Sequence, residues 1–360
     1  MDFLRFGLFS VGYCLLYQTW STIGSTIDVD GWDYDHHHTK PEDWTGVCKL
    51  GRAQSPININ THETVKAKIQ KPFIFHNYFE KTESTLRNNG HTLVMEFGAG
   101  GSSRKWINGG ALPGNNFELK QAHFHWGSTG DQGSEHTINN RYSPMEMHLV
   151  HWNKDIAETY EEAVKHKSYN SLAVLAVNFK LGEMNSKLEN FFLSTKKVRT
   201  QNQITNLEPG VIFEDFLPDN TDKFFRYNGS LTTPGCNQIV VWTIFKERVE
   251  ISQSQMDAFR KTTYIHEGED SARVISNNYR PTQPLNGRRV LDIKLKSLKP
   301  HGNRKDKEKF NNSEDMKNKK GKMVNNKSLN NSGNAMITSM TNKYSMYFRL
   351  IVVIHFYATN

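Results

Sequence analysis

The sequence has no apolar run long enough to cross a bilayer, no internal repeat and only three cysteines. A transmembrane helix needs about 20 mainly apolar residues, whereas the apolar stretches at 6–17 and 347–357 are shorter and the second contains Arg349 and His355. The glycine-rich stretch 98–103 lacks the spacing of a dinucleotide-binding motif and the lysine of a P-loop. We therefore predict neither a membrane-spanning helix nor a nucleotide-binding loop, and we interpret 98–103 as a turn.

The positive charge is concentrated in one part of the chain. The net charge is +8, and residues 296–334 alone hold eleven Lys or Arg against four Asp or Glu. The remainder is therefore close to neutral, so no basic face for nucleic acid is expected. The basic segment leaves an anionic surface or matrix open as a partner.

The N-terminus has the pattern of an export signal. Arg5 precedes the apolar run 6–17 and small residues follow, so we interpret 1–24 as a signal peptide. A buried N-terminal helix is the alternative. Cys14 lies inside this segment, which leaves Cys48 and Cys236 in a secreted or extracellular chain. In an oxidising compartment these two favour a disulfide, although two buried thiols also fit.

Residues 27–295 have the composition of one mainly β domain. Short apolar or alternating runs are separated by turn residues, and few long helical patterns occur. Strands are predicted at 92–97, 117–126, 145–152, 171–179 and 237–246, and helices at 155–167 and 252–261.

The C-terminal part differs in composition from this domain. Residues 296–343 are rich in Lys and Asn and poor in large apolar residues, so we expect a disordered tail. The short apolar end, 344–360, follows small residues and a spacer, which fits a glycolipid membrane anchor as well as plain secretion. Asn-x-Ser sequons make Asn311, Asn326 and Asn330 expected glycosylation sites, whereas Asn228 is expected to be too buried.

Two histidines two residues apart indicate a metal site. His123 and His125 would project from one face of a strand, because alternate side chains of a strand share a face. A third histidine, His148, lies in the apolar run 145–152 and joins them if the two strands pair antiparallel. Three neutral imidazoles leave a tetrahedral zinc ion one open position for water, which is typical of catalytic sites. The sequence therefore predicts a catalytic zinc site.

Strand histidines more often satisfy a buried hydrogen bond than bind metal, but their neighbours favour the metal here. Gln121 lies two residues before His123, and Glu146 lies two before His148. Each shares a strand face with a ligand and can fix the tautomer of its imidazole. Histidines 36–38 also cluster, but nothing near them completes a site, so we interpret them as solvated.

Eight segments, in order along the chain, closely resemble the alpha-class carbonic anhydrases. They cover roughly residues 30–292 and are WDY at 32–34, QSPI at 54–57, NNGH at 88–91, HFHWG at 123–127, SEHT at 134–137, EMHLVHW at 146–152, NGSLTTP at 228–234 and NNYRP at 277–281. The resemblance implies a single domain with a large, twisted, mostly antiparallel central sheet and short surface helices. It also implies a zinc-dependent lyase that interconverts carbon dioxide and bicarbonate.

The resemblance implies a role for each matching residue. His123, His125 and His148 are the expected zinc ligands, with water or hydroxide as the fourth. Zinc lowers the pKa of that water to about 7, a value for which carbonic anhydrase is itself the standard example. Thr232 is expected to accept a hydrogen bond from zinc-bound hydroxide and to donate one to Glu135. The hydroxide is thereby aimed at carbon dioxide.

Further matches concern proton transfer and the substrate. His91 is the expected proton shuttle, with Tyr34, Asn89 and Thr233 ordering the intervening water. Val94 stands where the family often has an amide, so this water chain is expected to be rearranged. The expected substrate-binding residues are Thr232 and Thr233 and an apolar wall of Val150, Val174, Leu231, Val240 and Trp242. The residues expected to support the site from behind are Gln121, Glu146, Asn89 and Asn277.

The resemblance also bears on the cysteines and on other functions of the same fold. Cys48 and Cys236 stand where secreted and membrane-bound members carry a disulfide, and His136 and His151 resemble structural histidines. One alternative is a non-catalytic extracellular binding protein, which is disfavoured because all three expected ligands are present. Another is a mineral- or matrix-associated protein whose basic tail binds anionic surfaces.

Overall fold

The computed structural model describes residues 32–34, 40–97, 104–262 and 273–296, all of which belong to one structural unit. Among them, no helix is long and apolar enough to span a bilayer. Several predictions lie outside the described residues: the signal peptide 1–24, histidines 36–38, the turn 98–103, the tail beyond Lys296 with Asn311, Asn326 and Asn330, and the apolar end 344–360.

The described residues form mainly strands. The strands are β1 Asn58–Ile59, β2 Val65–Ile69, β3 Phe73–His76, β4 Thr82–Asn88, β5 Leu93–Phe97, β6 Trp106–Gly109, β7 Phe117–Trp126, β8 Thr137–Ile138, β9 Met145–Asn153, β10 Leu172–Leu181, β11 Ile204–Val211, β12 Lys223–Gly229, β13 Val240–Phe245, β14 Val249–Ile251 and β15 Leu291–Leu295. The α-helices are α1 Val47–Leu50, α2 Tyr160–Lys165, α3 Glu189–Ser194 and α4 Gln253–Thr262.

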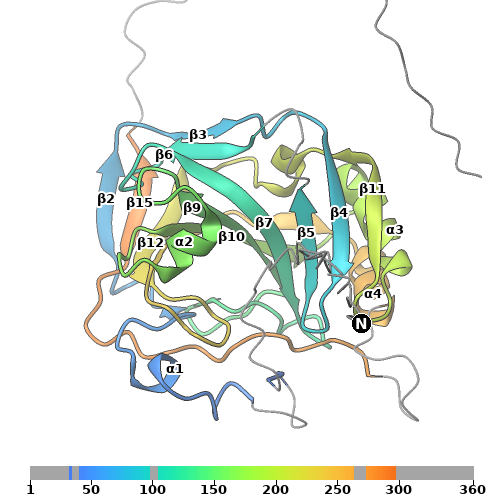
Figure 1. The fold of residues 1–360 in the computed structure, drawn as a ribbon, viewed down its shortest axis with the longest axis horizontal. Coiled ribbons are helices and arrows are strands. Elements are labelled where there is room, and N and C mark those ends of the chain that lie inside the picture. Colours follow the sequence, from blue (N-terminus) through green and yellow to red (C-terminus); the bar gives the residue numbers. More distant parts are fainter. Residues whose placement is uncertain (1–31, 35–39, 98–103, 263–272, 297–360) are drawn as a thin grey trace, which may run out of the picture. The chain divides into compact units, whose positions relative to one another are not determined.

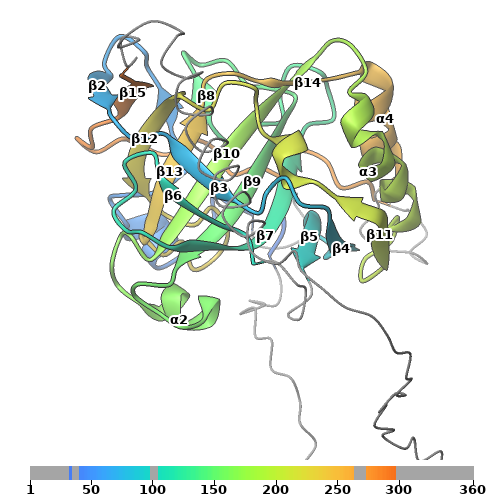
Figure 2. The ribbon, with the colours of Figure 1, turned by 90° about the horizontal axis from the view of Figure 1, so that it is seen from above.

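A mixed 13-stranded sheet organises these elements (Figure 1). Its main path is β11-β4-β5-β7-β9-β10-β13-β12-β15-β2, with β14 on β10 and β3 joined through β6 to β7. Most neighbours are antiparallel, and parallel pairs join β10 to β13, β10 to β14 and β15 to β2. Figure 2 shows α3 and α4 together beside β11, at one end of the sheet. The predicted large, mostly antiparallel sheet with short helices is confirmed.

The helix predicted at 155–167 is shorter in the structure. α2 begins after Thr159, whose hydroxyl accepts a hydrogen bond from the Glu162 N–H while the Glu162 carboxylate accepts one from the Thr159 N–H. Upstream, the Asn153 carbonyl closes two short turns instead of starting a helix. Local capping therefore sets the helix start, whereas α4 agrees with its prediction to within one residue.

The central strands bury both faces, and the two faces differ in chemistry. On β9, Met147 and Leu149 pack into the larger hydrophobic cluster. The alternate residues Glu146 and His148 face the other side and are almost completely buried there. A second, smaller hydrophobic cluster that includes Val150 lies on this polar side.

A β-bulge in β7 decides which of its residues face the polar side. Its pairing with β9 shifts between Leu119 and Gln121. Before the bulge Leu119 packs in the larger cluster, and after it the even-numbered residues from Ala122 onwards do. Because successive strand residues alternate between faces, this extra residue turns His123 and His125 away from the apolar core.

His151 is buried on the apolar side of β9. The Tyr78 hydroxyl lies 2.5 Å from its Nε2, and its Nδ1 lies 3.1 Å from the Ala173 carbonyl. Burial lowers the pKa of His151 from 6.5 to about 3. The imidazole is therefore neutral in the folded state, which fits the structural role expected from the sequence.

This buried imidazole makes stability depend on pH. Because its folded pKa lies below its unfolded pKa, the unfolded chain binds one more proton between about pH 6.5 and pH 3, and the free energy of unfolding falls as the pH falls through that window. Between pH 7.5 and 5.5, His151 should contribute a loss of about 1.4 kcal/mol. In urea unfolding, His151→Phe should lose less free energy of unfolding between pH 7.5 and 5.5 than wild type does. The exposed control His62→Phe should lose as much as wild type. An equal loss in His151→Phe and wild type would contradict neutral burial.

Candidate metal centre

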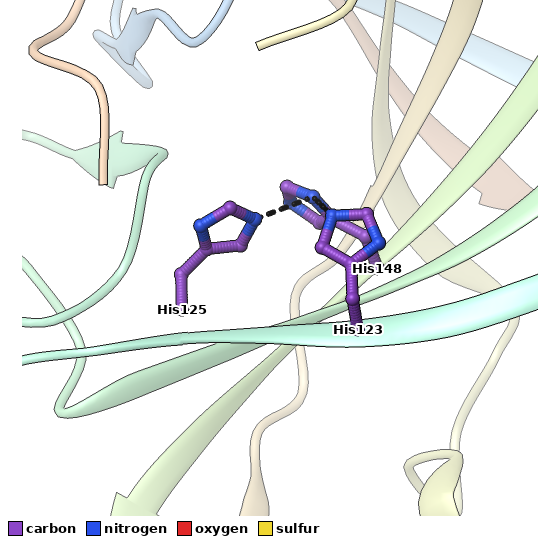
Figure 3. Close-up of side chains that lie close together, drawn as sticks. All are labelled: His123, His125 and His148. Carbon is purple, nitrogen blue, oxygen red and sulfur yellow. Dashed lines mark hydrogen bonds between the residues drawn. The ribbon is translucent and has the colours of Figure 1, made fainter. Parts of the chain in front are cut away.

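Three histidines from β7 and β9 point at one another. His123 and His148 are directly opposite in the β7–β9 ladder, as expected for an antiparallel pair, and His125 lies two residues further along β7. Nδ1 of His148 is 3.1 Å from Nε2 of His125 and 3.3 Å from Nε2 of His123. Figure 3 shows the three rings turned toward a common centre. The structure thus brings the three predicted ligands together.

The β7 histidines are held by acceptors on their far sides. Nδ1 of His123 lies 3.0 Å from Oε1 of Gln121, and Nδ1 of His125 lies 2.7 Å from the Asn278 carbonyl. A carbonyl oxygen only accepts, so each Nδ1 carries the proton and each Nε2 presents a lone pair to the centre. Burial, together with the neighbouring imidazoles, lowers the pKa of His123 well below 6.5, and burial also lowers that of His125. Both rings are therefore uncharged.

His148 is oriented the opposite way by a buried carboxylate. Its Nε2 lies 2.7 Å from Oε1 of Glu146, so its Nδ1 faces the other two histidines. Glu146 also accepts hydrogen bonds from the ring and the backbone N–H of His136, at 2.7 and 2.9 Å. Burial alone would raise the pKa of Glu146, but His136 and His148 hold it well below its usual value. An ionised Glu146 thus fixes the tautomer of His148.

The hydrogen-bond chain extends beyond Glu146. Nε2 of His136 lies 2.7 Å from the Tyr227 hydroxyl, which donates to Oγ of Ser55 at 2.8 Å. Ser55 in turn accepts a bond from the Ser230 N–H at 3.0 Å. The segment that carries Thr232 is therefore connected through hydrogen bonds to His148, one of the expected metal ligands. Sequence reasoning gave His136 only a structural role, and Tyr227 carried no local signal.

The spacing of the three lone pairs fits a tetrahedral metal ion. Zinc–imidazole bonds of about 2.0–2.1 Å in a tetrahedron place neighbouring nitrogens about 3.3 Å apart. The nitrogens of His123, His125 and His148 that face the centre all lie within 4.8 Å of one another, and the two contacts given above are close to the tetrahedral value. His136, Glu146 and His148 form a second such group, but its atoms are already joined by hydrogen bonds. The donor set therefore suits zinc at the first group.

Glu135 lies beside the ligands. Its Oε1 accepts a hydrogen bond from the Arg280 N–H at 2.9 Å, and its Oε2 lies 3.6 Å from Nε2 of His125. Oε2 is buried and has no hydrogen-bond partner among the described residues, so the bond expected from Thr232 is not formed. Thr232 itself is buried. Burial, with the charge of Glu135, raises the pKa of the Tyr34 hydroxyl well above 10.

The expected proton shuttle is held by an aromatic stack. The His91 ring lies 3.9 Å from the Trp32 ring with an interplanar angle of 7°. Oδ1 of Asn89 accepts hydrogen bonds from the backbone N–H groups of His91 and Thr92, at 3.0 and 2.8 Å. Asn89 thus shapes the turn that presents His91. Val94 is buried directly opposite His123 in the β5–β7 pair.

The predicted apolar wall is assembled from three neighbouring strands and one loop. Val150, Val174 and Trp242 are linked through the register of β9, β10 and β13. The Trp242 ring lies 4.8 Å from the His148 ring. All five predicted wall residues lie in or against the smaller hydrophobic cluster, namely Val150, Val174, Leu231, Val240 and Trp242.

Two asparagine expectations need correction. Asn277 is exposed and its Oδ1 accepts a hydrogen bond from the Ser128 N–H at 3.0 Å, whereas the buried neighbour Asn278 makes the contact to His125. Asn228 was expected to be buried, but it is exposed on β12. In both cases one residue is exposed and its neighbour in the sequence is buried. The sequence alone did not show which of the two faces the interior.

The predicted disulfide is confirmed. Cys48 and Cys236 are bonded across 188 residues and pack against Trp44. The Cys236 N–H donates to the Thr233 carbonyl at 3.0 Å. The crosslink therefore ties the half-buried Thr233 segment to the N-terminal part of the domain.

The largely buried group of three histidines on a mixed sheet could hold a metal ion, and one carboxylate oxygen of Glu135 beside it has no hydrogen-bond partner among the described residues. The chain belongs to the alpha-class carbonic anhydrases: the family model for eukaryotic-type carbonic anhydrase matches residues 39–294. It is 36% identical to carbonic anhydrase 4 of Mus musculus over 280 residues, 75% of this chain and 86% of the relative. It is 32% identical to carbonic anhydrase 15 of Mus musculus over 277 residues, 74% and 85% of the two chains. Human mitochondrial carbonic anhydrase 5B is 37% identical over 244 residues, 67% and 73% of the two chains.

Replacing the carboxylate behind His148 should weaken metal binding without emptying the site. In Glu146→Gln the side chain loses its charge, and an NH₂ group replaces one of the two oxygens that accept from His136 and His148, so zinc affinity should fall about 10–100-fold. Competition with a chromophoric chelator measures this affinity. Glu96→Gln, on β5 of the same sheet, is the matched control. An unchanged affinity in Glu146→Gln would show that the carboxylate does not support the ligand.

Proposed function

We propose that the chain catalyses the reversible hydration of carbon dioxide to bicarbonate and a proton, with one zinc ion held by His123, His125 and His148. The observation that carries this proposal is the convergence of three lone pairs, two of whose three separations are close to the tetrahedral value. When bound, zinc supplies a nucleophile at neutral pH by lowering the pKa of a coordinated water to about 7, the value for which this enzyme class is the standard example.

Glu135 and Thr232 are proposed to orient that nucleophile. The Arg280 N–H occupies Oε1 of Glu135, which leaves Oε2 to accept the Thr232 hydroxyl proton. A hydroxyl that donates to a carboxylate has only its lone pairs left for a second partner. Thr232 would therefore accept a hydrogen bond from the attacking oxygen and fix the direction of its lone pair.

The hydrophobic wall is proposed to hold carbon dioxide. Carbon dioxide has no net charge and no dipole, so an apolar surface of Val150, Val174 and Trp242 suits it. Thr233 is proposed to contact bicarbonate at the opening of this wall. Because bicarbonate is charged and the wall is apolar, the product is expected to leave readily.

Proton release is proposed to pass through His91. An imidazole has an ordinary pKa near 6.5, so it can carry a proton between the site and buffer at neutral pH. Tyr34 is proposed to order the water between them, and Val94 removes one polar partner from that path. Stacking on Trp32 defines one stable position of the His91 ring.

The chain is proposed to act outside the cytosol. The Cys48–Cys236 disulfide supports an oxidising compartment, and 1–24 has the pattern of a signal peptide. We propose a catalytic domain at 27–295, followed by a basic tail at 296–343. The end at 344–360 is proposed to direct a glycolipid anchor, with plain secretion as the alternative outcome, and the tail to contact anionic surfaces or matrix.

Loss of one ligand should abolish both metal and activity. Purified wild type should hold about one zinc per chain and hydrate carbon dioxide, whereas His148→Ala should lose zinc and at least about 100-fold in activity. Metal analysis with stopped-flow hydration assays measures both. The exposed His166→Ala is the control. A wild type that is folded, zinc-free and inactive in the presence of zinc would overturn the proposal.

Removing the shuttle should affect turnover and not zinc content. His91→Ala should slow turnover in dilute buffer about tenfold or more, because proton release becomes limiting. Concentrated imidazole buffer should restore the rate by replacing the missing group. Hydration assays across buffer concentrations test this. Unchanged turnover in dilute buffer would remove His91 from the mechanism.

A further inference from the structure

Asn228 projects from the face of the sheet opposite the metal centre. It is exposed, although the residues on either side of it in β12 are buried. A side chain added at Gly229 would meet Oγ of Ser55 at 2.1 Å and Trp242 at 3.0 Å, which lie on the metal side. Because strand residues alternate between faces, Asn228 points away from that side.

Asn228 begins the sequence Asn228-Gly229-Ser230, which is an acceptor for N-linked glycans. Its side-chain amide makes no hydrogen bond with any described residue, so nothing in the fold competes with a glycan there. Ser230 is completely buried in the folded domain, and its hydroxyl lies 2.9 Å from the Ser55 N–H. The whole sequon is therefore accessible only before this part of the domain folds.

The sheet topology keeps this sequon accessible while the chain is made. Among the described strands, β12 pairs with β13 and β15 alone, and both follow it in the sequence. β15 ends at Leu295, roughly 70 residues after Asn228, which takes about 4–14 s to synthesise at about 5–20 residues per second. Cys236, whose disulfide fixes the adjacent loop, is also made after Ser230. β13 ends at Phe245, so it follows Asn228 within about 1–3 s at the same rate, and β12 stays unpaired on its β15 side for the longer interval.

We propose that Asn228 carries an N-linked glycan, added to the nascent chain before β12 is paired. This rests on the export of the chain that the proposed function includes. The glycan projects from the sheet face away from His123, His125 and His148, so it leaves the metal centre open. The face around Asn228 is accordingly a solvent-exposed surface of the exported protein.

The test uses the full chain expressed in a secreting animal cell line. The variant Asn311→Gln/Asn326→Gln/Asn330→Gln removes the tail sequons, and Asn228→Gln is then added to it. Peptide mass spectrometry after peptide-N-glycosidase F in ¹⁸O-water marks each formerly glycosylated Asn as labelled Asp. The same measurement on wild type does not depend on how any variant folds.

The triple variant should retain one glycan at Asn228, and the fourfold variant should have none. Enzymatic removal of the glycan from native protein should leave carbon dioxide hydration unchanged within about twofold. Active, disulfide-bonded protein in the medium with Asn228 unlabelled would overturn the glycan but not the proposed function. A chain that stays in the cytosol, unglycosylated at every sequon, would overturn both the glycan and the proposed export.

Discussion

Three imidazole lone pairs that face one another in a buried site repel unless a cation lies between them. The rings of His123, His125 and His148 cannot turn away, because the other nitrogen of each is committed to an acceptor. Leaving such buried acceptors unsatisfied costs on the order of 1–3 kcal/mol each. A divalent cation would satisfy all three lone pairs at once, and the surrounding hydrogen bonds hold the three rings in the orientation that such a cation needs.

The central sheet positions these rings because its two faces differ in chemistry. One face packs the larger hydrophobic cluster, whose burial stabilises the domain. The other face places the three histidines beside a smaller apolar cluster, which is the combination that the proposed metal-activated water and apolar substrate require. The bulge at Leu119 and Gln121 makes this division possible, because without it the β7 histidines would lie on the apolar side.

The sequence predicted the group of three histidines and most central strands well, because both depend on local periodicity. His123, His125 and His148 could be found from a two-residue spacing and one further histidine, and β7 was predicted with its observed bounds. The bulge, the parallel pairing of β10 with β13 and the contacts of Asn278 depend on the tertiary register, which no local pattern contains. Because the tertiary register is not contained in a local pattern, Asn277 was wrongly predicted in place of Asn278, and Asn228 was wrongly predicted to be buried. Helix α2 was predicted too long because capping, not periodicity, set its start.

Zinc K-edge X-ray absorption spectroscopy on the purified protein tests the central claim most directly. The account predicts four-coordinate zinc with three imidazole nitrogens and one exchangeable oxygen at about 2.0–2.1 Å. A fourth protein ligand closing the site, or fewer than three imidazoles around the metal, would contradict it.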